Sequence, residues 1–183
     1  GLNIMPETND LESEKDIEKL GKMELPILLK PNRSSYGRGI ETIESEVQLQ
    51  EILANKREVL DGYAAQKFIQ GTDVTCVVYA SEGEILTHTI QESPEKGIRN
   101  YAKNDDLIYH DDPVVFQLVQ KAVKSLSWNG IACFDLRRDS NDGKVYLLEI
   151  NARFWGSVSS AFDKAHVNFP EITIRQGLGL EFI

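Results

Sequence analysis

The spacing of apolar and polar residues divides the chain into short strands and helices. Apolar runs bounded by glycine, proline or polar turns predict strands over 25–30, 40–43, 63–69, 74–80 and 84–90. Apolar positions at helical spacing predict helices over 14–21, from Ser45 to about Leu60, and over 114–126. Residues 91–112 form a long polar connection, and the last thirty residues show no clear period. This order predicts an α+β fold with antiparallel sheets.

Two more strands, over 131–138 and 144–151, flank the turn Asn141-Asp142-Gly143. A two-residue Asp142-Gly143 turn would place Leu136 opposite Glu149, whereas a three-residue loop with left-handed Gly143 places Asp135 there. The second register is expected because it separates an apolar face from a polar one. Its apolar face has Ala132, Phe134, Leu136, Tyr146, Leu148 and Ile150, and its polar face has Cys133, Asp135, Arg137, Leu147, Glu149 and Asn151.

The polar face of this hairpin is a candidate metal site. Asp135 and Glu149 would stand directly opposite each other, so one must be protonated or a cation must lie between them. Asn151 adds a third oxygen on that face, a donor set that suits Mg²⁺, and Arg153 follows where it could contact phosphates. The alternative is an exposed hairpin whose acids pair with Arg137 and Arg153.

Two further segments have features of nucleotide-binding loops. Residues 28–40 form a strand, a basic glycine-containing loop and a strand, and Lys30 ends the first strand, where it can point into a cleft. Residues 65–73 form a strand interrupted by Gly71; its edge could face an adenine, and Asp73 could accept from ribose hydroxyls. The alternatives are a mobile hairpin for the first segment and a bulged strand with a solvated Asp73 for the second.

Charge and composition exclude several classes of protein. The 183 residues contain 29 acids against 20 bases, for a net charge of −9, which argues against nucleic-acid partners. No apolar run approaches the roughly 18 residues of a membrane span, and no signal peptide is evident. The two cysteines, Cys76 and Cys133, are too few for a disulfide framework. A cytoplasmic protein without a membrane partner is therefore expected.

The order of these motifs resembles the ATP-grasp superfamily, in particular the carbamoyl-phosphate synthase large chain and biotin carboxylase. The most specific element is Leu147-Leu148-Glu149-Ile150-Asn151-Ala152-Arg153, and Phe154-Trp155-Gly156-Ser157 resembles the carboligase-like branch. The resemblance covers about 25–178. It implies two lobes with antiparallel sheets and ATP bound in the cleft between them. A small lid lobe is expected over 1–62 and a large lobe over 63–183, with the family's upstream substrate domain absent.

The resemblance also implies a role for each matching residue. Lys30 would bind the α- and β-phosphates, and Arg153 would stabilise the acyl phosphate and its transition state. The metal, Mg²⁺ or alternatively Mn²⁺, would be held by Asp135, Glu149 and Asn151. The remaining nucleotide contacts would come from Ser35, Tyr36, Gly37, Arg38, Gly39, Gln66, Lys67, Phe68, Ile69, Asp73 and Leu148.

What the resemblance implies for activity is an ATP-dependent ligase of the carboxylate–amine or carboxylate–thiol type. It would use ATP to activate a small carboxylate as an acyl phosphate, which a nucleophile then attacks. Two alternatives stay open: a non-catalytic ATP-binding regulatory module, and a kinase-like phosphotransferase on the same fold. A homo-oligomer is also open. Because the chain begins at Gly1 and lacks the family's upstream lysine, we expect it to bind ATP weakly and turn over little on its own.

Overall fold

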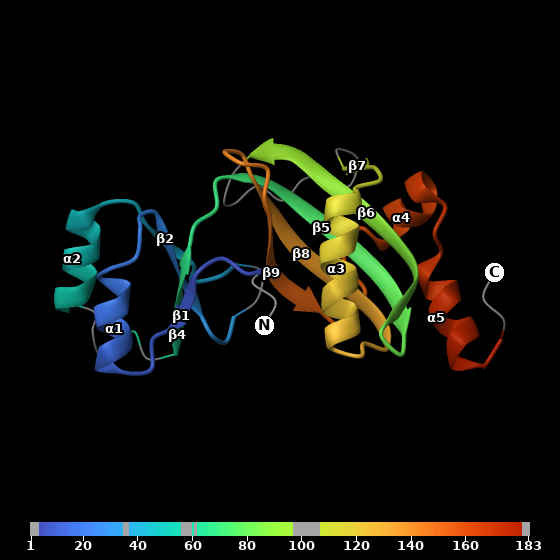
Figure 1. Cartoon of the computed structure of the whole chain (residues 1–183), viewed down its shortest axis with the longest axis horizontal. Coiled ribbons are helices and arrows are strands. Elements are labelled where there is room, and N and C mark those ends of the chain that lie inside the picture. Colours follow the sequence, from blue (N-terminus) through green and yellow to red (C-terminus); the bar gives the residue numbers. More distant parts are fainter. Residues whose placement is uncertain (1–3, 35–36, 56–59, 61, 97–106, 181–183) are drawn as a thin grey trace. The chain divides into compact units, whose positions relative to one another are not determined.

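The chain folds into two compact units. The computed structural model describes residues 4–34, 37–55, 60, 62–96 and 107–180, with the backbone alone for 94–96. Met5–Ile69 form one unit, here the N-terminal unit, and Gln70–Ile183 with Gly1–Ile4 form the other, the C-terminal unit (Figure 1). The boundary between the units was expected after residue 62, but it lies after Ile69. The strand that begins at Tyr63 is paired within the sheet of the N-terminal unit and so belongs to that unit.

The N-terminal unit is a four-stranded antiparallel sheet with two helices. The sheet order is β1-β4-β2-β3. Its strands are β1 (Thr8–Asp10), β2 (Ile27–Pro31), β3 (Glu41–Ile43) and β4 (Tyr63–Lys67), and its helices are α1 (Glu14–Leu20) and α2 (Glu46–Asn55). Strand β1 was not predicted, and residues 56–59 of the helix expected to reach Leu60 lie outside the described residues.

Local signals and burial explain these helices. The Ser13 side chain accepts a hydrogen bond from the Asp16 backbone N–H at 3.4 Å and caps α1. Leu20 of α1 and Leu49 of α2 are almost fully buried in one cluster with Ile27 of β2. Both helices lie on the same side of the sheet in Figure 1. The unit therefore has its own apolar core, which is what allows it to form a compact body.

The C-terminal unit is a five-stranded antiparallel sheet covered on both faces. The sheet order is β7-β6-β5-β8-β9. The strands are β5 (Gly71–Ser81), β6 (Glu84–Lys96), β7 (Ile108–Tyr109), β8 (Gly130–Asp139) and β9 (Val145–Asn151), and the helices are α3 (Pro113–Ser125), α4 (Val158–Ala165) and α5 (Phe169–Gly177). None of the described helices is long and apolar enough to cross a bilayer.

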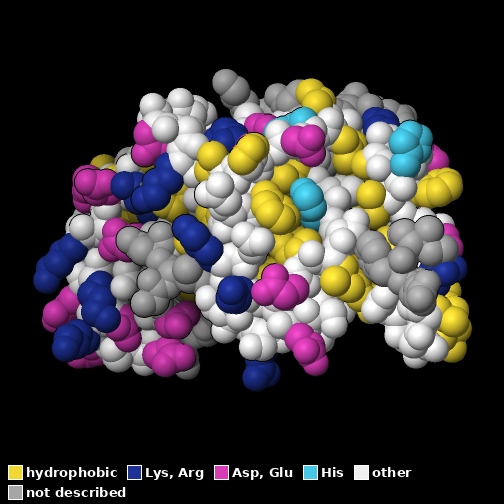
Figure 2. Space-filling view, turned by 45° about the vertical axis from the view of Figure 1, so that its right-hand side comes forward, with side chains coloured by type: hydrophobic (Ala, Val, Ile, Leu, Met, Phe, Trp, Pro, Cys, Tyr) yellow, Lys and Arg dark blue, Asp and Glu magenta, His cyan; other side chains and the backbone are white. Residues whose placement is uncertain are grey.

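Alternating residues of the central strands build the two cores of this sheet. Val78 and Phe134 face α3 and pack with its buried Val119. Val77 faces the other way and packs with Phe169 of α5. In Figure 1, α3 lies along one face of the sheet, and α4 and α5 lie apart from α3. On the molecular face drawn in Figure 2, Lys and Arg side chains are interspersed with Asp and Glu rather than gathered in one patch.

Three expectations for this unit are corrected. Strand β6 continues to Lys96, well into the segment expected to be a polar connection, because its residues pair with β5 as far as Thr72. Gly71 does not interrupt one strand but begins β5, which belongs to a different sheet from β4. The last thirty residues, which have no clear period, contain α4 and α5.

The β8–β9 hairpin has the expected register at one end only. Asp135 pairs with Glu149, as predicted, but the register then shifts by one residue, so that Leu136 pairs with Leu147 and Leu148 is left in a bulge. Leu147 consequently lies in the apolar core with α3, and Tyr146 moves to the opposite face. The predicted faces of Leu147 and Tyr146 are wrong for this reason. Gly143 is left-handed, with φ of 71°, as predicted.

Candidate functional site

The acidic pair predicted from the hairpin is present in the C-terminal unit. Asp135 of β8 stands directly opposite Glu149 of β9. Asn151 donates from Nδ2 to Oδ2 of Asp135 at 3.0 Å, so the third predicted ligand lies beside the pair. On the other side of β8, Thr75 of β5 donates from Oγ1 to Oδ1 of Asp135 at 3.5 Å. Asp135 is half-buried and Glu149 is exposed, which leaves one side of the pair open to solvent.

Burial and charge make Asp135 the unusual group of this site. Burial and the facing Glu149 carboxylate raise the pKa of Asp135 from 3.8 to about 6, although the Asn151 hydrogen bond and the Arg153 charge act in the opposite direction. The Arg153 charge therefore does not fully offset burial and the repulsion from Glu149. A divalent cation between the two carboxylates would supply further positive charge.

The donor set at this position fits Mg²⁺. Among the described residues no group of three His, Cys, Asp or Glu side chains is arranged around a common point. A metal ion here would therefore be bound by only two carboxylates, those of Asp135 and Glu149. The amide oxygen of Asn151 would be the third protein ligand. Mg²⁺ is commonly held by one or two carboxylates, with its other positions left to water and substrate phosphates.

We predict that Asp135→Asn stabilises the metal-free protein at neutral pH. The raised pKa means that the folded state favours the protonated Asp135 carboxyl. The contribution of this carboxyl to the free energy of unfolding is therefore present at low pH and is lost as the pH rises through about 6. The variant should match the wild type near pH 4 and melt roughly 2–4 °C higher near pH 7.5, about 1 kcal/mol for a protein of this size.

Thermal unfolding in EDTA at the two pH values measures this difference. Asn151→Ala is the matched control, because it removes the Asp135 hydrogen bond without removing a negative charge and should lower the melting temperature. Equal melting temperatures for wild type and Asp135→Asn at pH 7.5 would show that the facing carboxylates do not repel.

The arginines near the acidic pair have separate partners. Arg137 of β8 is buried and donates from Nη1 to Oδ1 of Asp73, its partner on the neighbouring strand β5, at 2.5 Å. This pairing engages the carboxylate that was expected to meet a ribose. Arg153 lies just beyond β9, is exposed, and donates from Nη1 to the Phe154 carbonyl at 3.1 Å. Its guanidinium is close enough to lower the pKa of Asp135.

Lys30 in the N-terminal unit belongs to a chain of hydrogen bonds across three strands. Its Nζ donates to Oε1 of Gln66 at 2.6 Å, Nε2 of Gln66 donates to Oγ1 of Thr8 at 2.9 Å, and that hydroxyl donates to the Pro6 carbonyl at 2.9 Å. The Gln66 side chain is buried, with 4% exposure. The family resemblance implied a nucleotide contact for Gln66, largely through its backbone, and no local pattern marks its partnership with Lys30.

The segment expected to contact adenine is not a free strand edge throughout. Gln66 lies in β4 between β1 and β2, and pairs with both. The backbone N–H groups of Lys67 and Phe68 donate to the carbonyls of Glu7 and Pro26, at 2.8 and 3.0 Å. Ile69 is buried. Adenine contacts from Lys67 and Phe68 would therefore use carbonyl oxygens or side chains, since these two N–H groups already have acceptors.

The predicted phosphate-binding loop is described in part. Ser35 and Tyr36 lie outside the described residues, whereas Gly37 and Gly39 have φ of 65° and 76°. A Cβ at Gly39 would also approach Pro31 to 3.0 Å, so both conformation and space require glycine there. Arg38 is exposed, and its carbonyl accepts from the Ser34 hydroxyl at 2.5 Å.

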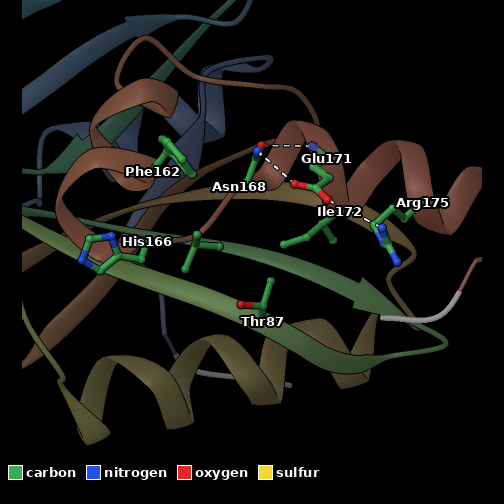
Figure 3. Close-up of a pocket in the computed structure, with 8 residues that line it drawn as sticks. Thr87, Phe162, His166, Asn168, Glu171, Ile172 and Arg175 are labelled. Atoms are coloured by element: carbon green, nitrogen blue, oxygen red, sulfur yellow. Dashed lines mark hydrogen bonds and ion pairs between the residues drawn. The ribbon is translucent and has the colours of Figure 1, made fainter. Parts of the chain in front are cut away.

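Two described cavities lie away from the predicted site residues. One, of about 270 Å³, is enclosed by β6, α4 and α5 and is lined by Thr87, Phe162, His166, Val167, Asn168, Glu171, Ile172 and Arg175 (Figure 3). Arg175 and Glu171 of its lining form an ion pair at 3.7 Å. The other, of about 320 Å³, lies beside α2 in the N-terminal unit. Neither cavity includes the acidic pair or Lys30.

The chain is similar in sequence to known enzymes. The curated relatives include a D-alanine–D-alanine ligase of Neisseria meningitidis serogroup B, 24% identical, and a carbamoyl-phosphate synthase of Methanobrevibacter smithii, 27% identical. The matches cover 82% and 75% of this chain, but 52% and 38% of those proteins, so the chain spans about half of their length or less.

A solved structure and a family model complete the comparison. The fold matches a Campylobacter jejuni biotin carboxylase in complex with a β,γ-ATP compound, with a TM-score of 0.74, 18% identity, and coverage of 98% of this chain and 44% of that one. The ATP-grasp domain model matches residues 4–157, which contain Lys30, both acids, Asn151 and Arg153. The chain therefore belongs to the ATP-grasp family, as its motifs predicted.

Proposed function

We propose that this chain is the ATP-grasp catalytic part of an ATP-dependent ligase that joins a carboxylate to an amine or a thiol. The observation that carries the proposal is the placement of Asp135 opposite Glu149, with Asn151 hydrogen-bonded to Asp135 and Arg153 immediately beyond. Binding of ATP alone does not require this complete set. Family membership supports the same class of reaction, since the matched relatives include ligases of this type.

The proposed reaction is phosphoryl transfer followed by displacement. A carboxylate oxygen attacks the γ-phosphorus of ATP and the bond to ADP breaks, which gives an acyl phosphate. The nucleophile then attacks the acyl carbon, and inorganic phosphate leaves. The chain would contribute positioning and neutralisation of charge rather than a covalent nucleophile.

Each residue has a part in this proposal that its chemistry supports. The Lys30 ammonium would bind phosphate oxygens as a point charge, and the exposed Arg153 guanidinium would bind the acyl phosphate. Asp135, Glu149 and Asn151 would hold the metal ion. Mg²⁺ bound there would neutralise negative charge on the phosphates. The proposed further contacts to ATP come from Asp73, Leu148 and the 35–39 loop.

Calorimetry and a turnover assay together test this function. We expect titration of ATP to give a binding isotherm that requires Mg²⁺. In the full-length protein we expect ADP release to rise when a panel of small carboxylic acids is added. Inorganic phosphate should appear only when a suitable amine or thiol is present. Binding of MgATP without turnover by any acid in the full-length protein would instead indicate a non-catalytic module, and a stable phosphorylated product would indicate a phosphotransferase.

We predict that Gln66→Leu weakens MgATP binding by about tenfold, or about 1.4 kcal/mol. The substitution keeps most of the buried volume but removes the acceptor of the 2.6 Å hydrogen bond from Lys30, so the ammonium loses its fixed position. The dissociation constant from calorimetry measures the effect. Gln50→Leu, the same change at an exposed position of α2, is the matched control and should bind normally. Unchanged affinity in Gln66→Leu would exclude Lys30 positioning by this side chain.

A further inference from the structure

We infer that Gln91 and Ser157 are positioning residues that fix the segment 152–156 and thereby the place of Arg153. The inference rests on the proposed function, because it assigns a purpose to the placement of Arg153. Gln91 lies on β6 and Ser157 directly precedes α4, so the two residues are far apart in the sequence. Neither was a candidate for the site from sequence.

The contact between these residues is buried and polar. Nε2 of Gln91 donates to Oγ of Ser157 at 3.1 Å, and the same hydroxyl lies 3.4 Å from Oε1 of Gln91. Gln91 is 5% exposed and Ser157 is 6% exposed. A buried polar group that loses its partner cannot turn to water instead, so the fold strongly favours keeping the two side chains together.

Gln91 lies in the same cross-strand row as the acidic pair. Gln91 of β6 is opposite Thr75 of β5, Thr75 is opposite Asp135 of β8, and Asp135 is opposite Glu149 of β9. All four side chains therefore lie on one face of the sheet, in a line perpendicular to the strands. The hydrogen bond to Gln91 brings Ser157 to the β6 end of this row, whereas the acids occupy the other end.

The chain after β9 must therefore cross this face. Asn151 ends β9 beside the acids, and Ser157 is held near β6, three strand spacings or about 14 Å away. Six residues reach at most about 20 Å, so the connection has little slack. Arg153 lies in this connection, close to its acidic end. Its N–H donates to the Asn151 carbonyl at 2.9 Å, which fixes its backbone from that side.

A second anchor supports the same segment. Trp155 is 8% exposed and packs in the apolar cluster of this face with Val77 and Cys133. Its ring meets that of Phe169 edge to face, with centroids 5.2 Å apart. Trp155 and Ser157 thus hold the far end of the connection, while Arg153 itself is exposed. The position of its guanidinium depends on these anchors, and misplacement of a charge-stabilising group by about 1 Å can cost up to about 100-fold in rate.

Fluorescence tests the anchoring without reference to activity. With Trp128→Phe as background, Trp155 is the only tryptophan of the chain. Gln91→Leu should shift its emission to the red and increase quenching by acrylamide, and Ser157→Ala should do the same from the other partner. Ser157→Thr keeps the hydroxyl and should restore the wild-type signal. Thr89→Val is the matched control, since Thr89 is a buried hydroxyl on the same strand for which no hydrogen-bond partner is found.

A double-mutant cycle tests the link to Arg153. In the ADP-release assay, Gln91→Leu should lower kcat about tenfold and leave the KM for ATP nearly unchanged. In an Arg153→Ala background the same substitution should change kcat less than twofold, because the residue through which it acts is gone. Thr89→Val should leave kcat unchanged in both backgrounds.

The outcomes separate this inference from the proposed function. The positioning role is wrong if Arg153→Ala lowers kcat but Gln91→Leu and Ser157→Ala do not. It is also wrong if Gln91→Leu lowers kcat as much in the Arg153→Ala background as in the wild type. In both cases the proposed function stands. If Trp155 emission is unchanged in both variants, the anchoring is wrong. If Arg153→Ala turns over ATP like the wild type, the proposed role of Arg153 fails, and the inferred role of its anchors fails with it.

Discussion

Replacing Glu149 with Gln in the full-length protein is expected to lower Mg²⁺-dependent ATP turnover by at least about 100-fold. The substitution keeps the size of the side chain and one carbonyl oxygen, but it removes one of the two charges that face each other across β8 and β9. A metal held by Asp135 and a neutral amide would bind weakly, since charge dominates the affinity of Mg²⁺ for oxygen ligands. ADP release measured over a range of Mg²⁺ concentrations gives the size of the loss.

The fold should tolerate this change, which makes the result interpretable. Glu149 is exposed, so the melting temperature of the metal-free variant should equal or slightly exceed that of the wild type. Glu84→Gln is the matched control, because Glu84 is an exposed glutamate of the same sheet away from the acidic pair. Turnover by Glu149→Gln with the Mg²⁺ dependence of the wild type would remove the metal role from this residue.

The acidic pair could be predicted because its signal is local. The strands on either side of a short turn fix which residues face each other, and only one register separates apolar from polar side chains around Asp135 and Glu149. The helices that begin at Glu14 and Pro113 are predictable for a similar reason. Their capping residues, Ser13 and Asp112, accept hydrogen bonds from the first turn.

The bulge at Leu148 could not be predicted from the same pattern. Leu147 and Leu148 are both apolar, so hydrophobicity does not show which of them enters the core. The structure places Leu147 in the α3 core, and the one-residue shift follows from that choice. The boundary between the units was misplaced for a related reason. The strands on either side of Gly71 look alike in sequence, although they belong to different sheets.

The partners of the two buried glutamines could not be predicted because these partners are remote in the sequence. Gln66 meets Lys30 and Gln91 meets Ser157 at sequence separations of 36 and 66 residues, and nothing near either glutamine indicates its partner. Each contact depends on the order of strands within a sheet, which single-sequence patterns leave open. These side chains hold charged groups of the candidate site in place, so the sequence revealed the charges but not their supports.

Gly71→Ala should destabilise the C-terminal unit by more than about 3 kcal/mol, which corresponds to a fall of roughly 6–12 °C in melting temperature. A Cβ at this position would lie 1.7 Å from the Arg138 carbonyl oxygen and 2.8 Å from its carbon. Both atoms belong to the backbone of β8, so no side-chain rotation relieves the overlap. Either β5 or β8 must move. Thermal unfolding followed by circular dichroism measures the loss.

The overlap at Gly71 should also reach the acidic pair. Gly71 pairs with Asp139 at one end of the β5–β8 ladder, and Thr75 pairs with Asp135 farther along it. Separation of the strands would therefore weaken the Thr75 contact and lower the affinity for Mg²⁺. Gly177→Ala at the end of α5 is the matched control, because nothing lies within 4 Å of its added Cβ, and it should leave both stability and affinity unchanged. If Gly71→Ala melts with the wild type, the close approach of β5 to β8 is not required for the fold.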